Sequence, residues 1–311
     1  MLQNPFNRQR KIIIGIHGLS NKPPRRLLAK WWRKSIRDGL FRHFSLRKHF
    51  RFRLVYWSDV IYEKPQDPTI KDKSHPRFLD EPYVPFQSSL KTSLGSWGKI
   101  LFDRFEHVID GLFLSKNSWI NLNYITDKIL RRKYRDLDIY YRDDLLVDEV
   151  DSNSLAREVI RKRLKAMLLR HKKKKIMLVA HSMGSIIAYD VLYDLKGEVE
   201  IDTFVTIGSP LGLPMVISKF FDERNIPYDS TTLRATPENV NQWYNFADVD
   251  DGIAANDDLS DEFIPNRLGA MPSDASVYND YKNWLTENAH KSFGYLRTKE
   301  MANVVRDFLT V

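Results

Sequence analysis

Apolar and polar positions along the chain form two alternating patterns. Short runs rich in β-branched and aromatic residues, which predict strands, lie at 11–16, 52–57, 176–180, 201–207 and 240–247. Longer stretches in which apolar residues follow helical spacing lie at 27–40, 154–170, 182–195 and 299–309. Strands that alternate with helices in this way predict βαβ units and a parallel sheet, an α/β fold.

Residues 58–152 interrupt this alternation. Their first third holds five prolines, and a stripe of apolar residues with helical spacing follows from Leu90 to Phe113. The segment is longer than the connecting loops of compact domains. We therefore predict an α/β core formed by residues 1–57 and 153–311, with a helical insertion at 58–152.

Composition narrows the kinds of site. The chain has no cysteine, which excludes disulfides, thiolate nucleophiles and Cys-ligated metal sites. The first residues lack the apolar segment of a signal peptide, and no stretch approaches the roughly 18 apolar residues of a spanning helix. These features predict a cytoplasmic protein.

The positive charge is clustered. The net charge is +9, and residues 25–53 hold eleven Lys or Arg against one acid, Asp38. A second basic block runs from Arg161 to Lys175. Solvated helix faces are the simpler explanation, because both blocks have helical spacing. As a binding surface, segment 25–53 predicts peripheral contact with an anionic membrane. Nucleic acid is not an expected partner, because the sequence carries no known nucleic-acid-binding motif.

The strongest chemical signal is Ala180-His-Ser-Met-Gly184, directly between a predicted strand and a predicted helix. A tight strand-to-helix turn needs small residues two positions before and after its central serine. Gly184 and Ala180 meet this need, although glycine is usual at the first position. Such a turn presents the Ser182 hydroxyl as a nucleophile at the positive end of a helix, where the N–H of Met183 can face an oxyanion. The alternative is a serine that only caps the helix.

His17-Gly18-Leu19 ends the first predicted strand. The loop at this place is where a second oxyanion donor is found in enzymes with a nucleophile turn of this kind. We expect that donor to be the N–H of Leu19. Gly18 lets the backbone approach the substrate, and His17 is expected to have a supporting, structural role.

An acidic loop after the last core strand offers three candidates for a triad acid. Asp251 is favoured, because a turn residue and a branched apolar residue follow it; Asp248 is the first alternative and Asp250 the second. The chain order Ser–Asp–His places the base after the acid, and of the eight histidines only His290 lies there. His181, next to the nucleophile, is expected to point away and pack.

Together these motifs resemble the α/β-hydrolase superfamily. More narrowly, they resemble bacterial lipase/esterase-like serine hydrolases that carry a Gly-Ser-Pro-Leu-Gly segment, here residues 208–212. The resemblance covers 11–57 and 153–311 and does not extend to 58–152. It implies a mainly parallel sheet with helices on both faces, without the first two strands of the full fold. It also implies that the insertion lies over the active site as a lid or cap.

The residues and the resemblance together predict a serine hydrolase that cleaves a carboxylic ester through an acyl-enzyme, without cofactor or metal. A lipid or another hydrophobic acyl ester is the expected substrate. The alternatives are an acyltransferase or thioesterase with the same triad, and a non-catalytic membrane- or nucleic-acid-binding module on the same fold. The last is disfavoured, because such a module need not keep Ser182, His290 and an acid.

Overall fold

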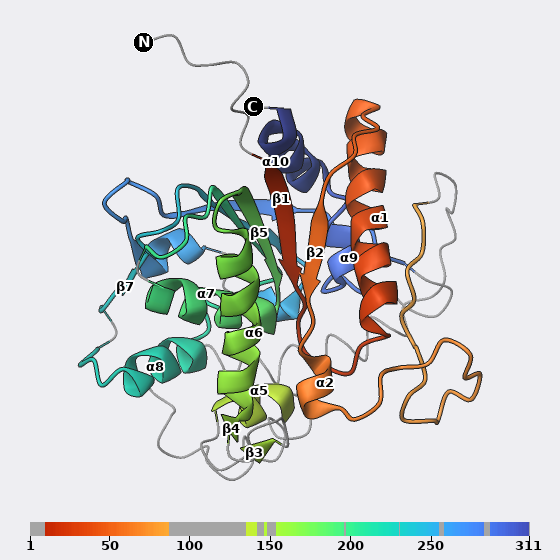
Figure 1. Cartoon of the computed structure of the whole chain (residues 1–311), viewed down its shortest axis with the longest axis horizontal. Helices are drawn as coiled ribbons and strands as arrows, with labels where there is room; N and C mark the ends of the chain where they lie inside the picture. Colours follow the sequence, from red (N-terminus) through yellow and green to blue (C-terminus); the bar gives the residue numbers. More distant parts are fainter. Residues whose placement is uncertain are drawn as a thin grey trace.

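The computed structural model centres on one six-stranded sheet with the strand order β10-β8-β6-β5-β1-β2 (Figure 1). It describes residues 10–86, 135–141, 146–147, 154–195, 197–229, 231–254, 258–282 and 287–310. The strands are β1 (Lys11–Ile16), β2 (Phe52–Val55), β5 (Lys175–His181), β6 (Thr203–Ile207), β8 (Trp243–Asp248) and β10 (Pro272–Val277). Every pairing within this sheet is parallel, which confirms the predicted α/β class.

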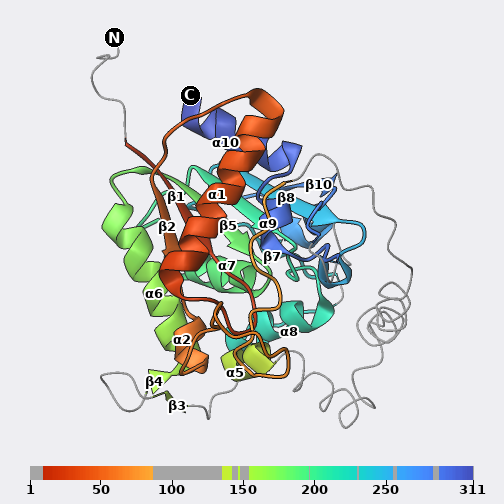
Figure 2. The same cartoon turned by 90° about the vertical axis from the view of Figure 1, so that its right-hand side faces the viewer.

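Helices cover both faces of the sheet (Figures 1 and 2). One face carries α6 (Ala156–His171), α7 (Met183–Leu195) and α8 (Pro214–Glu223). The other carries α1 (Arg25–Phe44), α9 (Ser292–Tyr295) and α10 (Lys299–Thr310). The smaller elements are α2 (Ser58–Ile61), α5 (Arg135–Tyr141), β3 (Leu146–Val147), β4 (Ser154–Leu155), β7 (Arg234–Ala235), β9 (Phe263–Ile264) and the 3-10 turns Gly252–Ala254 and Leu259–Glu262.

The alternation of side chains along a strand explains these two layers. In β1, Ile12 and Ile14 pack with the helices α6 and α7, whereas Ile13 packs with α1 and α10. Both faces of the strand are therefore buried. A strand in this position is a continuous apolar run, and that is the pattern the sequence shows there.

The part of 58–152 that the structure describes packs against the core. After α2, residues 62–86 run without long regular elements, apart from a bridge between Asp67 and Phe78. Helix α5 buries Leu137 and Tyr140 in the cluster formed with α6. The predicted apolar stripe from Leu90 to Phe113 lies outside the described residues, so the helical insertion stays a prediction there.

The parallel arrangement gathers the candidate residues at one end of the sheet. Ser182 follows β5, Gly18 follows β1 and Gly208 follows β6, while the acidic loop follows β8. Because the strands are parallel, all of these segments leave the sheet at its carboxyl end. This is the lower end in Figure 1, where α2 and α5 lie.

Candidate active site

Ser182 lies in a strained turn between β5 and α7. Its φ angle is 54°, in the left-handed region that a residue with a side chain seldom adopts. The turn is held by the Ser182 N–H, which donates to the Ile207 carbonyl at 3.1 Å. Gly184 is required, since a Cβ there would lie 2.7 Å from the carbonyl oxygen of Ile16 and 2.8 Å from that of His17. The motif therefore needs glycine at position 184, because the end of β1 and the loop after it lie directly against it.

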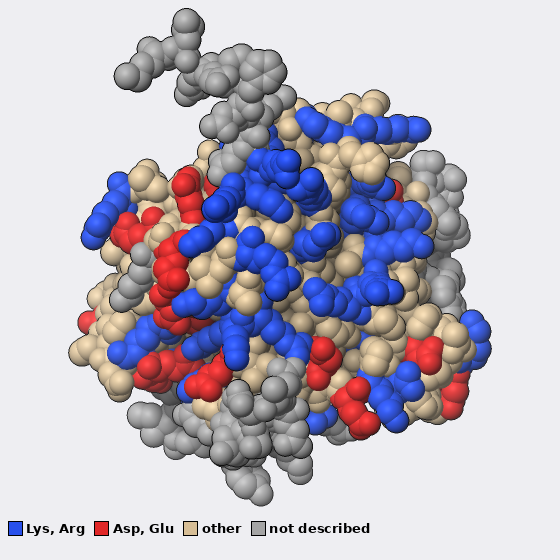
Figure 3. Space-filling model, in the orientation of Figure 1, with Lys and Arg blue, Asp and Glu red and all other residues tan. Residues whose placement is uncertain are grey.

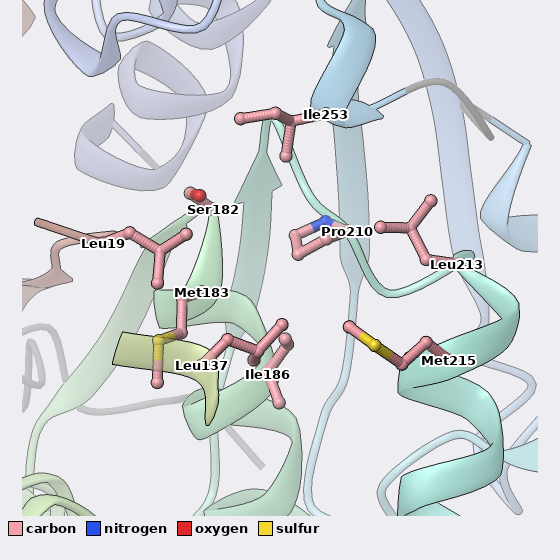
Figure 4. A pocket seen from close by; sticks show the side chains of 9 residues that line it. All are labelled: Leu19, Leu137, Ser182, Met183, Ile186, Pro210, Leu213, Met215 and Ile253. Carbon is pink, nitrogen blue, oxygen red and sulfur yellow. The ribbon is translucent and has the colours of Figure 1, made fainter. Parts of the chain in front are cut away.

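Gly18 lets that loop pass directly beside the serine. A Cβ on Gly18 would lie 2.6 Å from the Cβ of Ser182, closer than two carbons can approach. Leu19 and Met183, the two expected oxyanion donors, both line the same hollow as Ser182 (Figure 4). The structure thus brings both expected donor residues to the serine.

His17 holds this loop in place through hydrogen bonds and ring stacking. Its Nδ1 donates to the Gly18 carbonyl at 2.9 Å, and its Nε2 accepts the N–H of Trp57 at 3.1 Å. Its ring stacks on the Trp57 indole with centroids 4.8 Å apart. Burial, with a smaller contribution from the nearby charge of Lys22, lowers the pKa of His17 to about 3, so the ring is neutral. Its contacts are those of a buried scaffold residue.

Asp251 and His290 form a close pair. His290 Nδ1 lies 2.8 Å from Oδ2 and 2.9 Å from Oδ1 of Asp251. Tyr295 Oη donates to Asp251 Oδ2 at 2.6 Å, and the Ile253 N–H donates to Oδ1 at 3.1 Å. Burial alone would raise the pKa of Asp251, but the charge of His290 and these hydrogen bonds outweigh it and hold that pKa below its ordinary value. The carboxylate is therefore ionised at neutral pH.

The two other acids of the loop have different surroundings. The Asp248 carboxylate accepts the backbone N–H groups of Asp250, at 2.8 Å, and of Asn279. Asp250 itself is exposed. Of the three acids that the sequence offered, Asp251 is thus the one whose carboxylate meets the His290 ring.

The loop that carries His290 is clamped by residues that the sequence did not single out. Asn279 Nδ2 donates to the carbonyls on either side of the histidine, those of Ala289 at 2.5 Å and Lys291 at 2.9 Å. Nothing in the local sequence marks Asn279 for this role or Tyr295 for its bond to Asp251, because Asn279 lies 10 and 12 residues from its partners and Tyr295 lies 44 residues from Asp251.

His181 also holds this loop. It is buried, as expected, but its ring packs against the His290 ring with centroids 4.8 Å apart. Its Nε2 donates to the His290 carbonyl at 2.7 Å. Burial first, and the neighbouring His290 second, lower the pKa of His181 well below its ordinary value, so it stays neutral. His181 positions the backbone of His290 rather than exchanging protons with it.

Gly208 joins the two halves of the site. Its φ angle is 53°, and a Cβ there would lie 2.8 Å from Asp251 Oδ2 and 3.1 Å from His290 Nδ1. The residue before it, Ile207, accepts the Ser182 N–H. Gly208 therefore adjoins both the nucleophile turn and the Asp251–His290 pair. The buried Ser182 Oγ has no hydrogen-bond partner among the described residues, so the serine and the His290 ring are not bonded in this structure.

An apolar hollow opens at Ser182 (Figure 4). It is lined by Leu19, Leu137, Ser182, Met183, Ile186, Pro210, Leu213, Met215 and Ile253. Ser182 supplies the only polar side chain of this lining. In the part of the chain that the structure describes, no group of three or more His, Asp or Glu side chains is arranged to hold a metal ion.

Comparison with known proteins supports the α/β architecture. The model of the family described as PGAP1, PGAP1-like alpha/beta domain, matches residues 150–268. The match spans the nucleophile turn and Asp251 but stops before His290. No curated protein matches the chain. The all-parallel sheet, the strained serine between β5 and α7 and this family match together show that the chain belongs to the α/β-hydrolase superfamily.

Proposed function

We propose that the chain is a serine hydrolase that cleaves a carboxylic ester, with Ser182 as nucleophile, His290 as general base and Asp251 as triad acid. The observation that carries this proposal is the ionised Asp251, 2.8 Å from His290 Nδ1, at the same end of the sheet as a strained serine whose hydroxyl has no hydrogen-bond partner among the described residues. The order Ser–Asp–His along the chain agrees with it.

The contacts suit the steps of such a reaction. Asp251 accepts the Nδ1–H of His290, which leaves Nε2 to take the Ser182 proton once the serine hydroxyl is turned toward it. Ser182 Oγ then attacks the ester carbonyl, and the N–H groups of Leu19 and Met183 stabilise the oxyanion. His290 returns its proton to the leaving alcohol. In the second half-reaction His290 takes a proton from water, the water oxygen attacks the acyl carbonyl, and His290 gives the proton to Ser182 Oγ as the carboxylic acid leaves.

The hollow at Ser182 supports a hydrophobic acyl group as the bound part of the substrate. Its lining is apolar except for the nucleophile itself, so a polar acyl group would lose hydration without gaining hydrogen bonds. Met183 and Met215 lie on opposite walls in Figure 4, and flexible thioether side chains tolerate acyl chains of different shape.

Fluorophosphonate labelling with mass-spectrometric mapping tests this proposal. We expect one labelled peptide, containing Ser182, and loss of labelling in Ser182→Ala and His290→Ala. Ser74→Ala, at an exposed loop serine, is the matched control and should label like the native chain. Hydrolysis of esters of increasing acyl length then measures the chain-length preference. A folded protein that stays unlabelled even in detergent, or a label that persists in Ser182→Ala, contradicts the proposal.

We also propose that the basic face makes peripheral contact with an anionic membrane. Figure 3 shows Lys and Arg gathered over α1, α6 and the edge of the sheet at β2. At the amino end of the sheet, an open groove, here called the basic groove, is lined by Arg10, Lys11, Ile12, Lys48, His49, Phe50, Arg51 and Leu309. Clusters of this charge attract anionic lipid headgroups. No helix among the described residues has both the length and the apolar character needed to cross a membrane.

A further inference from the structure

The peptide that follows the expected oxyanion donor is held at both of its polar atoms. Lys22 Nζ donates to the Leu19 carbonyl. The Ser20 N–H, on the other side of the same peptide, donates to Asp136 Oδ2 at 2.5 Å. Ser20 has a φ angle of 73°, so this peptide sits in a turn that a residue with a side chain does not favour. Two external contacts therefore fix an otherwise unfavourable loop.

The surroundings of Asp136 suit a buried carboxylate. It is 2% exposed, and its second oxygen, Oδ1, accepts the Tyr62 hydroxyl at 2.6 Å. A buried carboxylate is costly unless it is paired and hydrogen-bonded. Here its partners are the Ser20 N–H, the Tyr62 hydroxyl and the positive charge of Lys22, which lies near enough to interact with it.

Asp136 belongs to α5, a helix inside the segment that the sequence set apart from the core. The other end of α5 is anchored by Tyr140, whose hydroxyl donates to Asp190 Oδ2 at 2.7 Å. Asp190 in turn accepts Arg161 Nη2 at 2.6 Å. Between these two ends, Leu137 lines the hollow beside Ser182. Helix α5 thus contacts the Ser20 N–H, the hollow at Ser182 and the ion pair between Arg161 and Asp190.

We infer that α5 is a working part of the catalytic site, in which Asp136 and Lys22 are positioning residues that fix the Leu19–Ser20 peptide and so aim the Leu19 N–H at the oxyanion formed on Ser182. This inference rests on the proposed function. A preorganised oxyanion donor typically contributes 10²–10³ in kcat, because the donor needs no reorientation during the reaction. A loop released from its two contacts loses that advantage while the acyl hollow still binds substrate.

A purely structural role for Asp136 makes a different prediction. In that case its removal lowers the melting temperature, and each folded molecule keeps its native kcat. The positioning role lowers kcat itself, measured below the melting transition, and leaves KM nearly unchanged.

Kinetic comparison of the native chain with Asp136→Ala, Asp136→Asn, Lys22→Met and the double variant Asp136→Ala/Lys22→Met tests the inference. Fluorophosphonate labelling of the native chain first establishes that Ser182 is reactive, so failure of the proposed function is seen separately. We expect kcat to fall at least about tenfold in Asp136→Ala and Lys22→Met, with KM changing less than about threefold. Asp136→Asn should lose less, since its amide oxygen can still accept the Ser20 N–H.

Because both residues act on one peptide, the kcat of the double variant should be only slightly lower than that of the less active single variant. Exposed residues provide the matched controls, Asp307→Ala on α10 and Lys162→Met on α6, and both should keep native kcat. Native kcat in Asp136→Ala, a rise in KM alone, or a loss that follows only the unfolded fraction overturns the inference.

A pH profile supplies a second readout. Burial, followed by the charge of Lys291, lowers the pKa of Lys22 to about 8. Lys22 is therefore charged below that pH and loses its charge as the pH rises through it. The charged or titratable groups around Lys22 are His17, Tyr56, Asp80, Glu81, Asp136, His181 and Lys291. We expect kcat to fall above about pH 8 in the native chain and not in Lys22→Arg, which stays charged. Identical profiles above pH 8 overturn the role of Lys22.

Discussion

The two ends of the sheet use charge in opposite ways. At the carboxyl end, the Asp251 side chain is 0% exposed and the His290 side chain 19%, and the two meet at 2.8 Å. At the amino end, the basic groove presents Lys48, Arg51 and their neighbours to solvent. A buried pair interacts strongly and at one geometry, whereas exposed charges are screened and act by their number. Single substitutions should therefore have large effects at the carboxyl end and small ones at the amino end.

The largest expected effect separates two acids of one loop. Asp251→Asn should lower kcat by about 10³–10⁴, because the amide cannot hold the His290 tautomer or stabilise its charge. Asp248→Asn should instead lower the melting temperature, since it weakens the contacts to the N–H groups of Asp250 and Asn279, and should keep most of kcat. Steady-state kinetics and thermal unfolding of both variants measure the difference. Equal losses of kcat would remove the distinction between the two acids.

Gly208→Ala should have the next largest effect. The added Cβ would meet Asp251 Oδ2 at 2.8 Å and His290 Nδ1 at 3.1 Å, so the pair must shift. A displacement of about 1 Å at a catalytic group can cost about 10² in rate. Gly269→Ala is a matched control, because Gly269 also has a positive φ but a Cβ there meets nothing within 4 Å. Activity retained in Gly208→Ala would show that the geometry at the carboxyl end is looser than we describe.

At the amino end, Arg51→Ser should weaken binding to vesicles that contain anionic lipid by about fivefold at low salt, and less at higher salt. Hydrolysis of a short soluble ester should stay unchanged, since the substitution lies at the far end of the sheet. Arg267→Ser, whose side chain is 89% exposed away from the groove, is the control. Vesicle sedimentation checks the binding. Binding that ignores both the substitution and the salt would argue against a membrane role for this face.

The smallest effect concerns stability in acid. The folded-state pKa of Asp251 lies below its ordinary value, so this carboxylate stabilises the fold above the unfolded-state pKa, and the contribution is lost as the pH falls through the folded value. Asp251→Asn lacks that contribution at every pH. The native chain should therefore lose more stability than Asp251→Asn when denaturant unfolding is repeated at decreasing pH below about 4. Parallel losses in the two proteins would show that the pair adds nothing to folding.

The sequence predicts those parts of the molecule whose causes are local. The strand, the turn and the helix around Ser182 follow one another directly, so one short motif reveals them. The apolar pattern does not predict β10, because Pro272–Val277 is an edge strand made largely of small and polar residues. Its Asp274 instead accepts the Asn245 side-chain amide at 2.8 Å.

The choice among the three acids has the same limit. Asp248 and Asp251 are three residues apart in one loop, and local composition does not determine which of them meets the base. The outcome depends on where the His290 loop comes to rest, and that loop is held by Asn279 and His181. Local sequence does not predict the contact of α5 with the loop after β1 either, since Asp136 meets Ser20 across 116 residues of chain.

The clamp around His290 also orders events in time during protein synthesis. The nucleophile turn needs β5, α7 and the Ile207 carbonyl, which are all translated before the acidic loop. Asn279 holds the loop of His290 and Tyr295 holds the Asp251 carboxylate, and both residues are translated after the whole of β8 and the acidic loop. Under the proposed function, a nascent chain therefore contains its nucleophile before it contains its base. Under the proposed function, hydrolysis begins only after the loop that carries His290 has reached the Asp251 carboxylate.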